Sequence, residues 1–401
     1  MRINAMDNEA RLKYANDHFF STGVGDGGAS LGEINMRFGL AKIHYLQEQM
    51  GQAPDAVFVS APDLTVTRNV NRWGSGYGYG GVLNWGDGSQ ELVILDLKPN
   101  ACGMIVGGIN QLVPMAELLE RTHSLVLEPV EIDGIQIQWD FGKGNHFIDI
   151  FEVDKHIEVD LPPYMFIIHM AGGELRGETQ YGPGLYWDYS QTLQSRMEIC
   201  ETPFGQIRFL TGKYSREYYE FYRFVEKFTQ KRREFAANKL FDDYSLINND
   251  AHQGMTHLNE IILGCYRFTD TQKLYPIGLR PDINAYLLRG LPNFNREKMK
   301  TLGFEERSIQ QNRYDFLSSI NILPHGGGYA FPDISKVNSV NSINGQRYFE
   351  VEMSSGQGRK IFSDIRNMPY EYRGIVVLER TLELEMAEVV ASLKPLYVLK
   401  V

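Results

Sequence analysis

Glycine-punctuated runs of β-branched and aromatic residues occupy the chain between residues 56 and 150. The runs are AVFVSAP, GYGYGGVLNW, ELVILDL, IVGGI, IQIQWDF and NHFIDIFEV. Short runs of this kind, bounded by glycine, are typical of β-strands joined by turns. The pattern therefore predicts a region that is rich in β-sheet.

Two longer segments have apolar residues at helical spacing. The first is residues 31–50, which stops before Gly51, and the second is residues 213–241. The apolar stripe of the second segment is made of Phe221, Phe224, Val225 and Phe228. The remaining chain mixes short strands with loops, so we expect an α+β fold with mixed sheets and surrounding helices.

The chain has 401 residues, of which 43% are hydrophobic and 22% charged, and no linker-like stretch divides it. This composition is ordinary for a globular protein with a large core, so we expect one domain over residues 1–401. The formal charge of −10 means that any contact with RNA requires a local basic patch.

Features of the chain favour a soluble, cytoplasmic protein. Three scattered cysteines are too few for a disulfide framework, which fits a reducing compartment. The first 20 residues lack the apolar segment of a signal peptide, and no run approaches the ~18 apolar residues of a membrane span. We therefore expect no contact with a membrane.

Four histidines and one cysteine stand beside glycines or in loop-like sequence. They are Cys102 in NACGM, His146 in GNHFID, His169 in HMAGG, His252 in AHQGM and His325 in HGGGY. Glycine lets the backbone approach a ligand closely, and a thiolate with imidazoles suits Mn, Fe, Co or Zn. Because the spacing is wide, each residue taken alone is more simply explained as part of the core or the surface.

We expect the other histidines and cysteines to be core or surface residues without a role in metal binding. They are His18, His44, His123, His156, His257, Cys200 and Cys265. His257 is the nearest to an exception, because it would lie one helical turn from His252.

Taken in chain order, these motifs resemble those of the RtcB family of GTP-dependent RNA ligases. The chain carries APD at residues 61–63, then GYGYGGV, NACGM, GNHFID, HMAGG, ANK, HQ, PIGL, HGGGY and a terminal LKV. GNHFID is the most specific of them. The resemblance covers residue 60 to the end, and residues 1–55 match less well.

The resemblance implies a single catalytic domain around a central cleft for metal and nucleotide. It assigns Cys102, His146, His169 and His252 to one or two Mn²⁺ ions, with Zn²⁺ or Co²⁺ as alternatives, and it makes His325 the nucleophile. In such ligases a histidine–GMP intermediate passes GMP to an RNA 3′-phosphate or 2′,3′-cyclic phosphate end, which is then joined to a 5′-hydroxyl.

The resemblance also assigns residues around the nucleotide. In an extended NHFIDI, Asn145, Phe147 and Asp149 share one face, where Asn145 would serve catalysis near the phosphates and the other two would flank guanine. The remaining nucleotide residues would be Gly326, Gly327, Gly328 and Lys400. Each of these residues also has a purely structural explanation. Asn145 could cap the end of a strand, the three glycines could form a tight turn, and Lys400 could be an incidental terminal lysine.

RNA contacts are expected from a few basic residues. Residues 213–241 are rich in lysine, arginine and tyrosine, which could bind phosphates and stack bases. An amphipathic helix with a solvated face explains most of them equally well. The residues that we single out are Lys239, Arg176, Arg232 and Arg233.

The match to the family breaks at several positions. Pro99 replaces an aspartate that binds metal in the family, with Asn100 and Asp96 nearby; Tyr329 replaces an arginine, and Val401 a glycine. HMAGG also lacks the arginine of the family motif. Two other functions therefore remain open, a homologue that binds RNA ends or a protein partner without ligating, and a metal-dependent phosphohydrolase. For the ligase we expect a monomer that acts on tRNA-like broken ends, with an accessory activating protein as a further partner.

Overall fold

The computed structural model describes residues 2–157, 159–343, 345–354, 356 and 358–401. Helices make up 31% and strands 35% of the chain, gathered around a large curled sheet. Of the pairings between the described strands, only that of β1 with β2 is parallel. The predicted α+β class is therefore confirmed, since an α/β fold would need a mostly parallel sheet.

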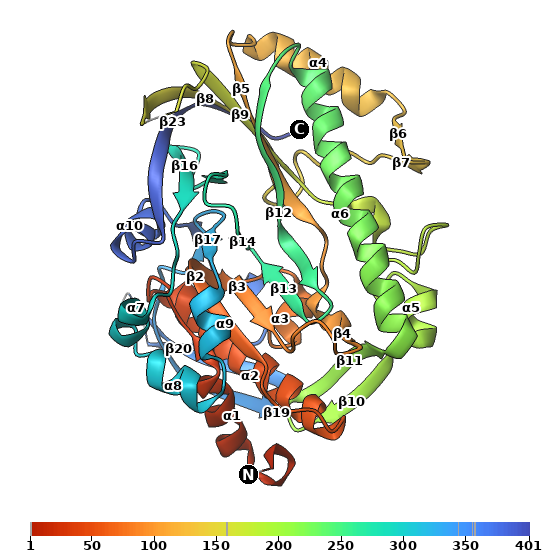
Figure 1. The fold of residues 1–401 in the computed structure, drawn as a ribbon, viewed down its shortest axis with the longest axis vertical. Coiled ribbons are helices and arrows are strands. Elements are labelled where there is room, and N and C mark those ends of the chain that lie inside the picture. The colour runs from red at the N-terminus through yellow and green to blue at the C-terminus, as the bar shows by residue number, and fades with distance from the viewer. Residues whose placement is uncertain (1, 158, 344, 355, 357) are drawn as a thin grey trace.

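Strands from both ends of the chain join in the large sheet, which has 11 strands (Figure 1). In spatial order they are β1 (Phe19–Phe20), β2 (Val57–Val66), β3 (Gly78–Asn84), β13 (Glu260–Leu263), β12 (Ser245–His257), β5 (Cys102–Ile109), β9 (Tyr164–Met170), β8 (Phe147–His156), β23 (Ala387–Leu399), β16 (Ala285–Gly290) and β15 (Leu274–Ile277). The middle of this order is where the candidate metal ligands lie.

Two long helices cover the sheet. α6 (Gly212–Leu240) packs against β5, β9 and β12, and α2 (Gly27–Gln49) packs against β2. Figure 1 shows α6 running along one side of the molecule. The shorter helices are α1 (Asn8–Asp17), α3 (Val70–Gly74), α4 (Met115–Leu127), α5 (Gln191–Arg196), α7 (Arg296–Thr301), α8 (Glu305–Gln310), α9 (Tyr314–Ser319) and α10 (Val376–Glu383).

Smaller sheets complete the fold. They comprise β4 (Leu92–Ile94) with β10 (Glu198–Thr202) and β11 (Gly205–Thr211); β6 (Glu131–Ile132) with β7 (Ile135–Gln136); β14 (Cys265–Arg267) with β17 (Ile322–Pro324); β18 (Tyr329–Ala330) with β22 (Glu371–Tyr372); and β19 (Ile334–Ile343) with β20 (Gln346–Met353) and β21 (Arg359–Phe362). The strand pairs β14/β17 and β18/β22 flank the segment that carries His325.

The predicted helices occur where the pattern indicated, with slightly different ends. α2 begins earlier than residue 31, because the side chain of Asp26 accepts a hydrogen bond from the N–H of Ala29 and caps the helix. The strand expected at IQIQWDF was wrong beyond Gln136. Trp139 and Phe141 stack on one another there, with ring centroids 5.3 Å apart, and join the core without a strand partner.

Among the described residues, no helix is long and apolar enough to cross a membrane.

Candidate metal centre and adjoining pocket

Four neighbouring strands bring the predicted ligands together. Cys102 begins β5, His169 is near the end of β9, His252 is on β12, and His146 immediately precedes β8. These strands are adjacent in the order β12–β5–β9–β8. Met104 lies opposite His169 in the ladder between β5 and β9, so their side chains share one face of the sheet. Cys102 is two residues before Met104 on the same strand, so its side chain projects on that face too.

A β-bulge places His252 at the same centre. Ala251 pairs with Gly103 and Gln253 pairs with Cys102, so two residues of β12 oppose the single Cys102. In such a bulge both opposing side chains lean to one face. His252 therefore reaches the thiol while Gln253 lines the adjoining pocket.

The ligand atoms of Cys102, His169 and His252 lie within 4.8 Å of one another, and all three residues are buried. The Nε2 atom of His169 is 3.0 Å from Cys102 Sγ and 3.1 Å from His252 Nε2. Tetrahedral coordination with bonds of about 2.0–2.3 Å would separate ligand atoms by about 3.5 Å. The three side chains could therefore hold one metal ion with a fourth position open.

Protonation of the imidazoles suits metal binding. The carbonyl of Asn145 can only accept, so His169 Nδ1, 3.1 Å away, carries the ring proton and leaves the lone pair of Nε2 for a metal. Burial lowers the pKa values of His169 and His252 well below the usual range. Both rings are therefore neutral at neutral pH, as ligation requires.

His146 stands beside this group of three. Its Nε2 is 3.6 Å from Cys102 Sγ, and its Nδ1 is 2.8 Å from a carboxylate oxygen of Asp140. Burial lowers the pKa of His146, but Asp140 and Cys102 outweigh it and raise the pKa to about 10. The carboxylate fixes the orientation of this ring, as outer partners of metal-binding histidines commonly do.

Arg232 holds that carboxylate, and the prediction that it binds RNA was wrong. Its side chain is fully buried, with its nitrogens 2.9 Å from Asp140 and 3.0 Å from Glu174. A buried guanidinium cannot touch a polynucleotide. Arg232 instead forms an ion-paired chain from α6 through Asp140 to His146.

Arg233 was also wrongly expected to bind RNA. It is fully buried, and its Nε donates to the side chain of Asn249 on β12 at 2.6 Å. Its Nη1 donates to the carbonyl of Ala101, next to Cys102, at 3.4 Å. This arginine therefore ties together the two strands that present Cys102 and His252.

His325 lies beside the metal ligands, with its ring centroid 4.4 Å from that of His252. Its Nδ1 is 2.9 Å from Oδ2 of Asp63, which is buried on β2. A carboxylate partner keeps the proton on Nδ1 and leaves Nε2 with a free lone pair, the state that a nucleophile needs. The sequence indicated Asp63 only as part of the APD motif, because its pairing with a residue 262 positions away leaves no local signal.

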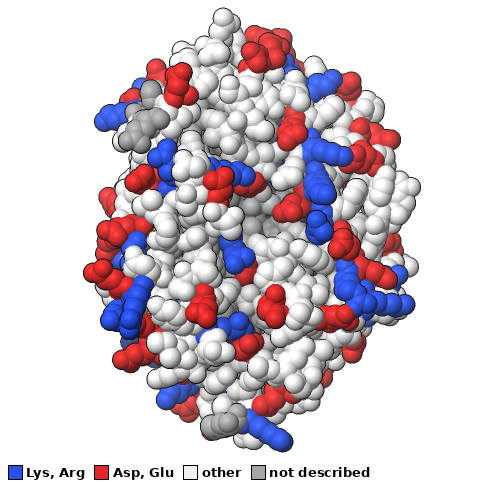
Figure 2. Space-filling view, viewed as in Figure 1, with Lys and Arg blue, Asp and Glu red and all other residues white. Residues whose placement is uncertain are grey.

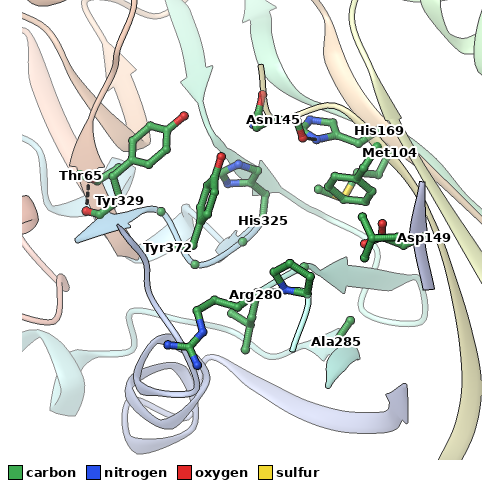
Figure 3. Close-up of a pocket in the computed structure, with 18 of the residues that line it drawn as sticks. Thr65, Met104, Asn145, Asp149, His169, Arg280, Ala285, His325, Tyr329 and Tyr372 are labelled. Atoms are coloured by element: carbon green, nitrogen blue, oxygen red, sulfur yellow. Dashed lines mark hydrogen bonds between the residues drawn. The ribbon is translucent and has the colours of Figure 1, made fainter. Parts of the chain in front are cut away.

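A pocket of about 330 Å³ adjoins the candidate metal ligands (Figure 3). His169 and His325 contribute to its wall. The cationic residues that line it are Arg68, Arg72, Arg280 and Lys400. Asp149 is the single carboxylate among the described lining residues, so the pocket favours an anionic ligand although the whole chain is acidic.

Asn145, Phe147 and Asp149 all line the pocket, as their expected alternation requires. Burial raises the pKa of Asp149 to about 8, against the opposing effect of Lys400. Oδ1 of Asp149 is buried and has no hydrogen-bond partner among the described residues. A perturbed, unpaired carboxylate facing a cavity is typical of a ligand-binding position. Lys400 also lines the pocket and donates to the carbonyl of Gly144 at 3.1 Å.

The three glycines after His325 form part of the pocket wall. The N–H of Gly327 donates to the carbonyl of Gly278 at 3.1 Å, so this N–H is not available to a phosphate. Gly328 has a φ of +63°, and a Cβ there would approach the carbonyl oxygen of Asp63 to 2.7 Å. Glycine is needed at this position so that the loop can pack against β2.

The remaining residues expected to bind RNA lie on the surface. Arg176 is exposed, and its guanidinium lies 5.7 Å from the ring of Tyr186. Lys239 is 3.7 Å from Glu128. Three other exposed cations of α6 have acidic partners: Arg216 with Glu91, Arg223 with Glu220 and Lys231 with Asp133. Acidic and basic side chains are interspersed on the face in Figure 2, which agrees with these pairings.

Asp96 and Asn100, the polar residues near Pro99, are engaged in other hydrogen bonds. Asp96 accepts from the backbone N–H and guanidinium of Arg208, at 3.0 and 3.2 Å. Asn100 uses its side-chain oxygen to accept from the N–H of Cys102 at 3.1 Å. Neither belongs to the cluster that could hold a metal among the described residues.

The other histidines lie away from this centre. His257 is 3.6 Å from Glu260 and is part of a strand, so the expected helical turn from His252 was wrong. His123 is exposed on α4, and the side chain of His156 lies outside the described residues. Buried His18 and His44 pack together with ring centroids 4.7 Å apart.

The pair formed by His18 and His44 should make stability depend on pH. Burial lowers the pKa of both rings, and the positive charge of Arg313 lowers both pKa values further. Asp17 and Asp55 act in the opposite direction and raise the pKa of His18, but the net shift is downward. Below the unfolded pKa of about 6.5, the unfolded chain binds protons that the folded chain does not. The free energy of unfolding should therefore fall as the pH falls, by up to about 1.4 kcal/mol per pH unit for each ring.

Urea unfolding between about pH 7 and pH 5 would measure this slope. His44→Asn should reduce the slope, because one of the two protonations is removed, whereas the exposed His123→Asn should leave it unchanged. An identical slope in His44→Asn and the unaltered chain would contradict the assignment.

A comparison with known proteins adds nothing to this geometry. Neither a protein-family model nor a curated protein matches the chain. Any function assigned to the protein therefore depends on the residues of the site.

Proposed function

We propose that this protein is a metal-dependent RNA ligase of the RtcB type, which joins 3′-phosphate or 2′,3′-cyclic phosphate ends to 5′-hydroxyl ends using GTP. The observation that carries the proposal is the position of His325. It stands next to the cluster of Cys102, His169 and His252, it is paired with a buried carboxylate, and it lines a pocket with four cationic residues.

The residues present fit the metal that this activity requires. A thiolate and two neutral imidazoles suit Zn²⁺, Co²⁺ or Mn²⁺, with a soft sulfur ligand favouring the first two. The carboxylate that would support a second ion is absent at Pro99, and His146 lies outside the cluster of three ligand atoms. We therefore propose a site for one ion, which would neutralise charge on the phosphates of the substrate when bound.

The protein residues would act in the following order. The lone pair of His325 Nε2 attacks the α-phosphorus of GTP, pyrophosphate leaves, and the Nδ1 proton stays beside Asp63. A 2′,3′-cyclic phosphate end would first be opened by water to the 3′-phosphate. The 3′-phosphate of RNA then attacks the phosphorus of the histidine–GMP, the P–N bond to His325 breaks, and the RNA end carries the GMP. Finally the 5′-hydroxyl of the second RNA end loses its proton to solvent and attacks the activated 3′-phosphorus, and GMP leaves, which closes the phosphodiester bond.

The pocket would hold the guanine and phosphates during these steps. Asp149 has an unpaired acceptor for the N1–H and amino group of guanine, and Phe147 offers a ring face beside it. Arg280, Arg72 and Lys400 would meet the phosphate charge, while Asn145 lies near the metal ligand His169. Arg176 and Lys239 remain proposed RNA contacts at the surface.

The test is covalent labelling of the purified protein with α-labelled GTP in the presence of Mn²⁺, Co²⁺ or Zn²⁺. The unaltered chain should become labelled, and His325→Ala should take no label because the attacking nitrogen is gone. His123→Ala removes an exposed histidine and should label normally. If the unaltered chain takes no label with any of the three metals, the ligase proposal fails.

A phosphohydrolase is the second candidate, and the open fourth metal position favours it. Three protein ligands and a free position are the arrangement that activates water in hydrolytic zinc sites. Such an enzyme would release inorganic phosphate from RNA ends with no label on the protein. Its activity would survive His325→Ala, whereas the ligase activity would not.

A further inference from the structure

Three tyrosines form a cluster of rings on the pair β18/β22, which carries none of the metal ligands. Tyr329 lies directly opposite Tyr372 in the ladder, with ring centroids 5.3 Å apart. Tyr370 is two residues before Tyr372, and its ring lies 4.9 Å from that of Tyr329 and 5.9 Å from that of Tyr372. The guanidinium of Arg68 lies 4.1 Å from the ring centroid of Tyr370.

Two members of this tyrosine cluster, Tyr329 and Tyr370, pack against the hydrophobic core but are not fully buried in it. All three tyrosines and Arg68 are half-buried, whereas Phe331, directly after β18, is buried. Tyr329, Tyr372 and Arg68 line the pocket. The cluster therefore keeps aromatic surface available to a ligand that enters the pocket.

The cluster and Asp149 lie at opposite sides of the pocket. Figure 3 shows Tyr329 and Tyr372 on one side, Asp149 on the other, and His325 between them. A ligand bound at the cluster would thus approach His325 from the side away from the proposed guanine position. The reaction requires such an arrangement, because the RNA phosphate must reach the nucleotide attached to His325.

The chemistry of the cluster suits a nucleobase. Aromatic rings stack on the faces of unpaired bases, and this stacking accepts any base because every base has a π face. A guanidinium beside the rings can also neutralise a backbone phosphate. Tyr329 occupies the position following the three glycines, so the loop of His325 itself brings one ring of the cluster into the pocket.

We propose that the tyrosine cluster, with Arg68, stacks the terminal unpaired base of the RNA 3′ end and so directs its phosphate toward His325. The identity of the ligand as RNA rests on the proposed function. The stacking itself makes a separate prediction, namely that binding depends on the presence of a terminal base.

The test compares two short single-stranded RNAs that end in a 3′-phosphate, one intact and one with an abasic terminal nucleotide. Their affinities for the whole protein would be measured by fluorescence anisotropy at fixed salt, without GTP. The unaltered chain should bind the abasic RNA about 5- to 100-fold more weakly, because one base stack is lost.

Substitution of Tyr372, whose ring lines the pocket, completes the test. Tyr372→Ala should weaken binding of the intact RNA by a similar factor and should show a smaller difference between the two RNAs. Tyr372→Phe should keep most of the difference, because stacking needs the ring and not the hydroxyl. Tyr348→Ala, which removes a tyrosine from the surface of β20, is the matched control.

Each result bears on the cluster. Equal affinity of the unaltered chain for the two RNAs overturns the proposal, as does the absence of binding to either RNA. An unchanged difference between the RNAs in Tyr372→Ala overturns it too. Since labelling of His325 uses GTP without RNA, base-dependent binding without labelling would reject only the ligase chemistry. Labelling with base-independent binding would reject only the cluster.

Discussion

Replacing Asp63 by asparagine is expected to slow the covalent labelling of His325 by about 10³- to 10⁴-fold. The carboxylate now accepts the Nδ1 proton of His325 at 2.9 Å and so fixes which ring nitrogen has the lone pair. An amide can instead donate its own N–H to Nδ1, which moves the ring proton to Nε2 and removes the nucleophile. In the histidine–aspartate pair of serine proteases this change lowers the rate by roughly 10⁴-fold without disturbing the geometry.

The rate of labelling with α-labelled GTP, followed at several GTP concentrations, would measure this effect. Because Asp63 positions His325 and need not touch GTP, the maximal rate should fall while the half-saturating concentration changes little. Asp242→Asn, which alters an exposed carboxylate just beyond the end of α6, is the control. Equal maximal rates for Asp63→Asn and the unaltered chain would show that this carboxylate does not set the state of the ring.

Replacing Cys102 by alanine is expected to weaken metal binding by about 10²- to 10³-fold. Zinc sites with four ligands contribute about 10–16 kcal/mol, which corresponds to roughly 3–4 kcal/mol for each ligand. Cys102 is 3.0 Å from His169 Nε2 and 3.6 Å from His146 Nε2, so its loss removes the atom that both rings approach.

Metal content after dialysis, together with competition against a chromophoric chelator, would measure this affinity. The unaltered chain should hold one equivalent of Zn²⁺ or Co²⁺. Co²⁺ should give the visible absorption of a thiolate complex, which Cys102→Ala should lack. Cys200→Ala removes a half-buried cysteine away from the cluster and should bind like the unaltered chain. Retention of tight binding and of the thiolate absorption in Cys102→Ala would contradict the proposed ligand set.

The local sequence determined the elements that are set by short-range patterns. The helix of residues 213–241 follows from apolar residues at a period of 3.6, and the alternation of Asn145, Phe147 and Asp149 follows from the period of an extended strand. The local sequence could not show that the strand expected at IQIQWDF stops after Gln136, because a strand exists only where a partner strand pairs with it.

Glycine-flanked histidines and a glycine-flanked cysteine also marked the members of the candidate centre in the sequence. The resemblance to a ligase family ordered these residues into a hypothesis about their roles. It also expected Arg232 and Arg233 to bind RNA. Charge along a helix does not tell which face is buried, and both guanidiniums proved to be buried. Arg233 joins the strands of Cys102 and His252, and Arg232 holds the carboxylate of Asp140.

Only the tertiary structure decided which side chains meet. The pairing of Asp63 with His325, the bulge that aims His252 at Cys102, and the ring contacts of Tyr329, Tyr370 and Tyr372 join segments that are far apart in the chain. Sequence patterns report periods of about two to four residues, whereas these contacts depend on the order and register of strands in a sheet. The chain therefore specifies its chemical groups locally, and the register of the sheet brings them together.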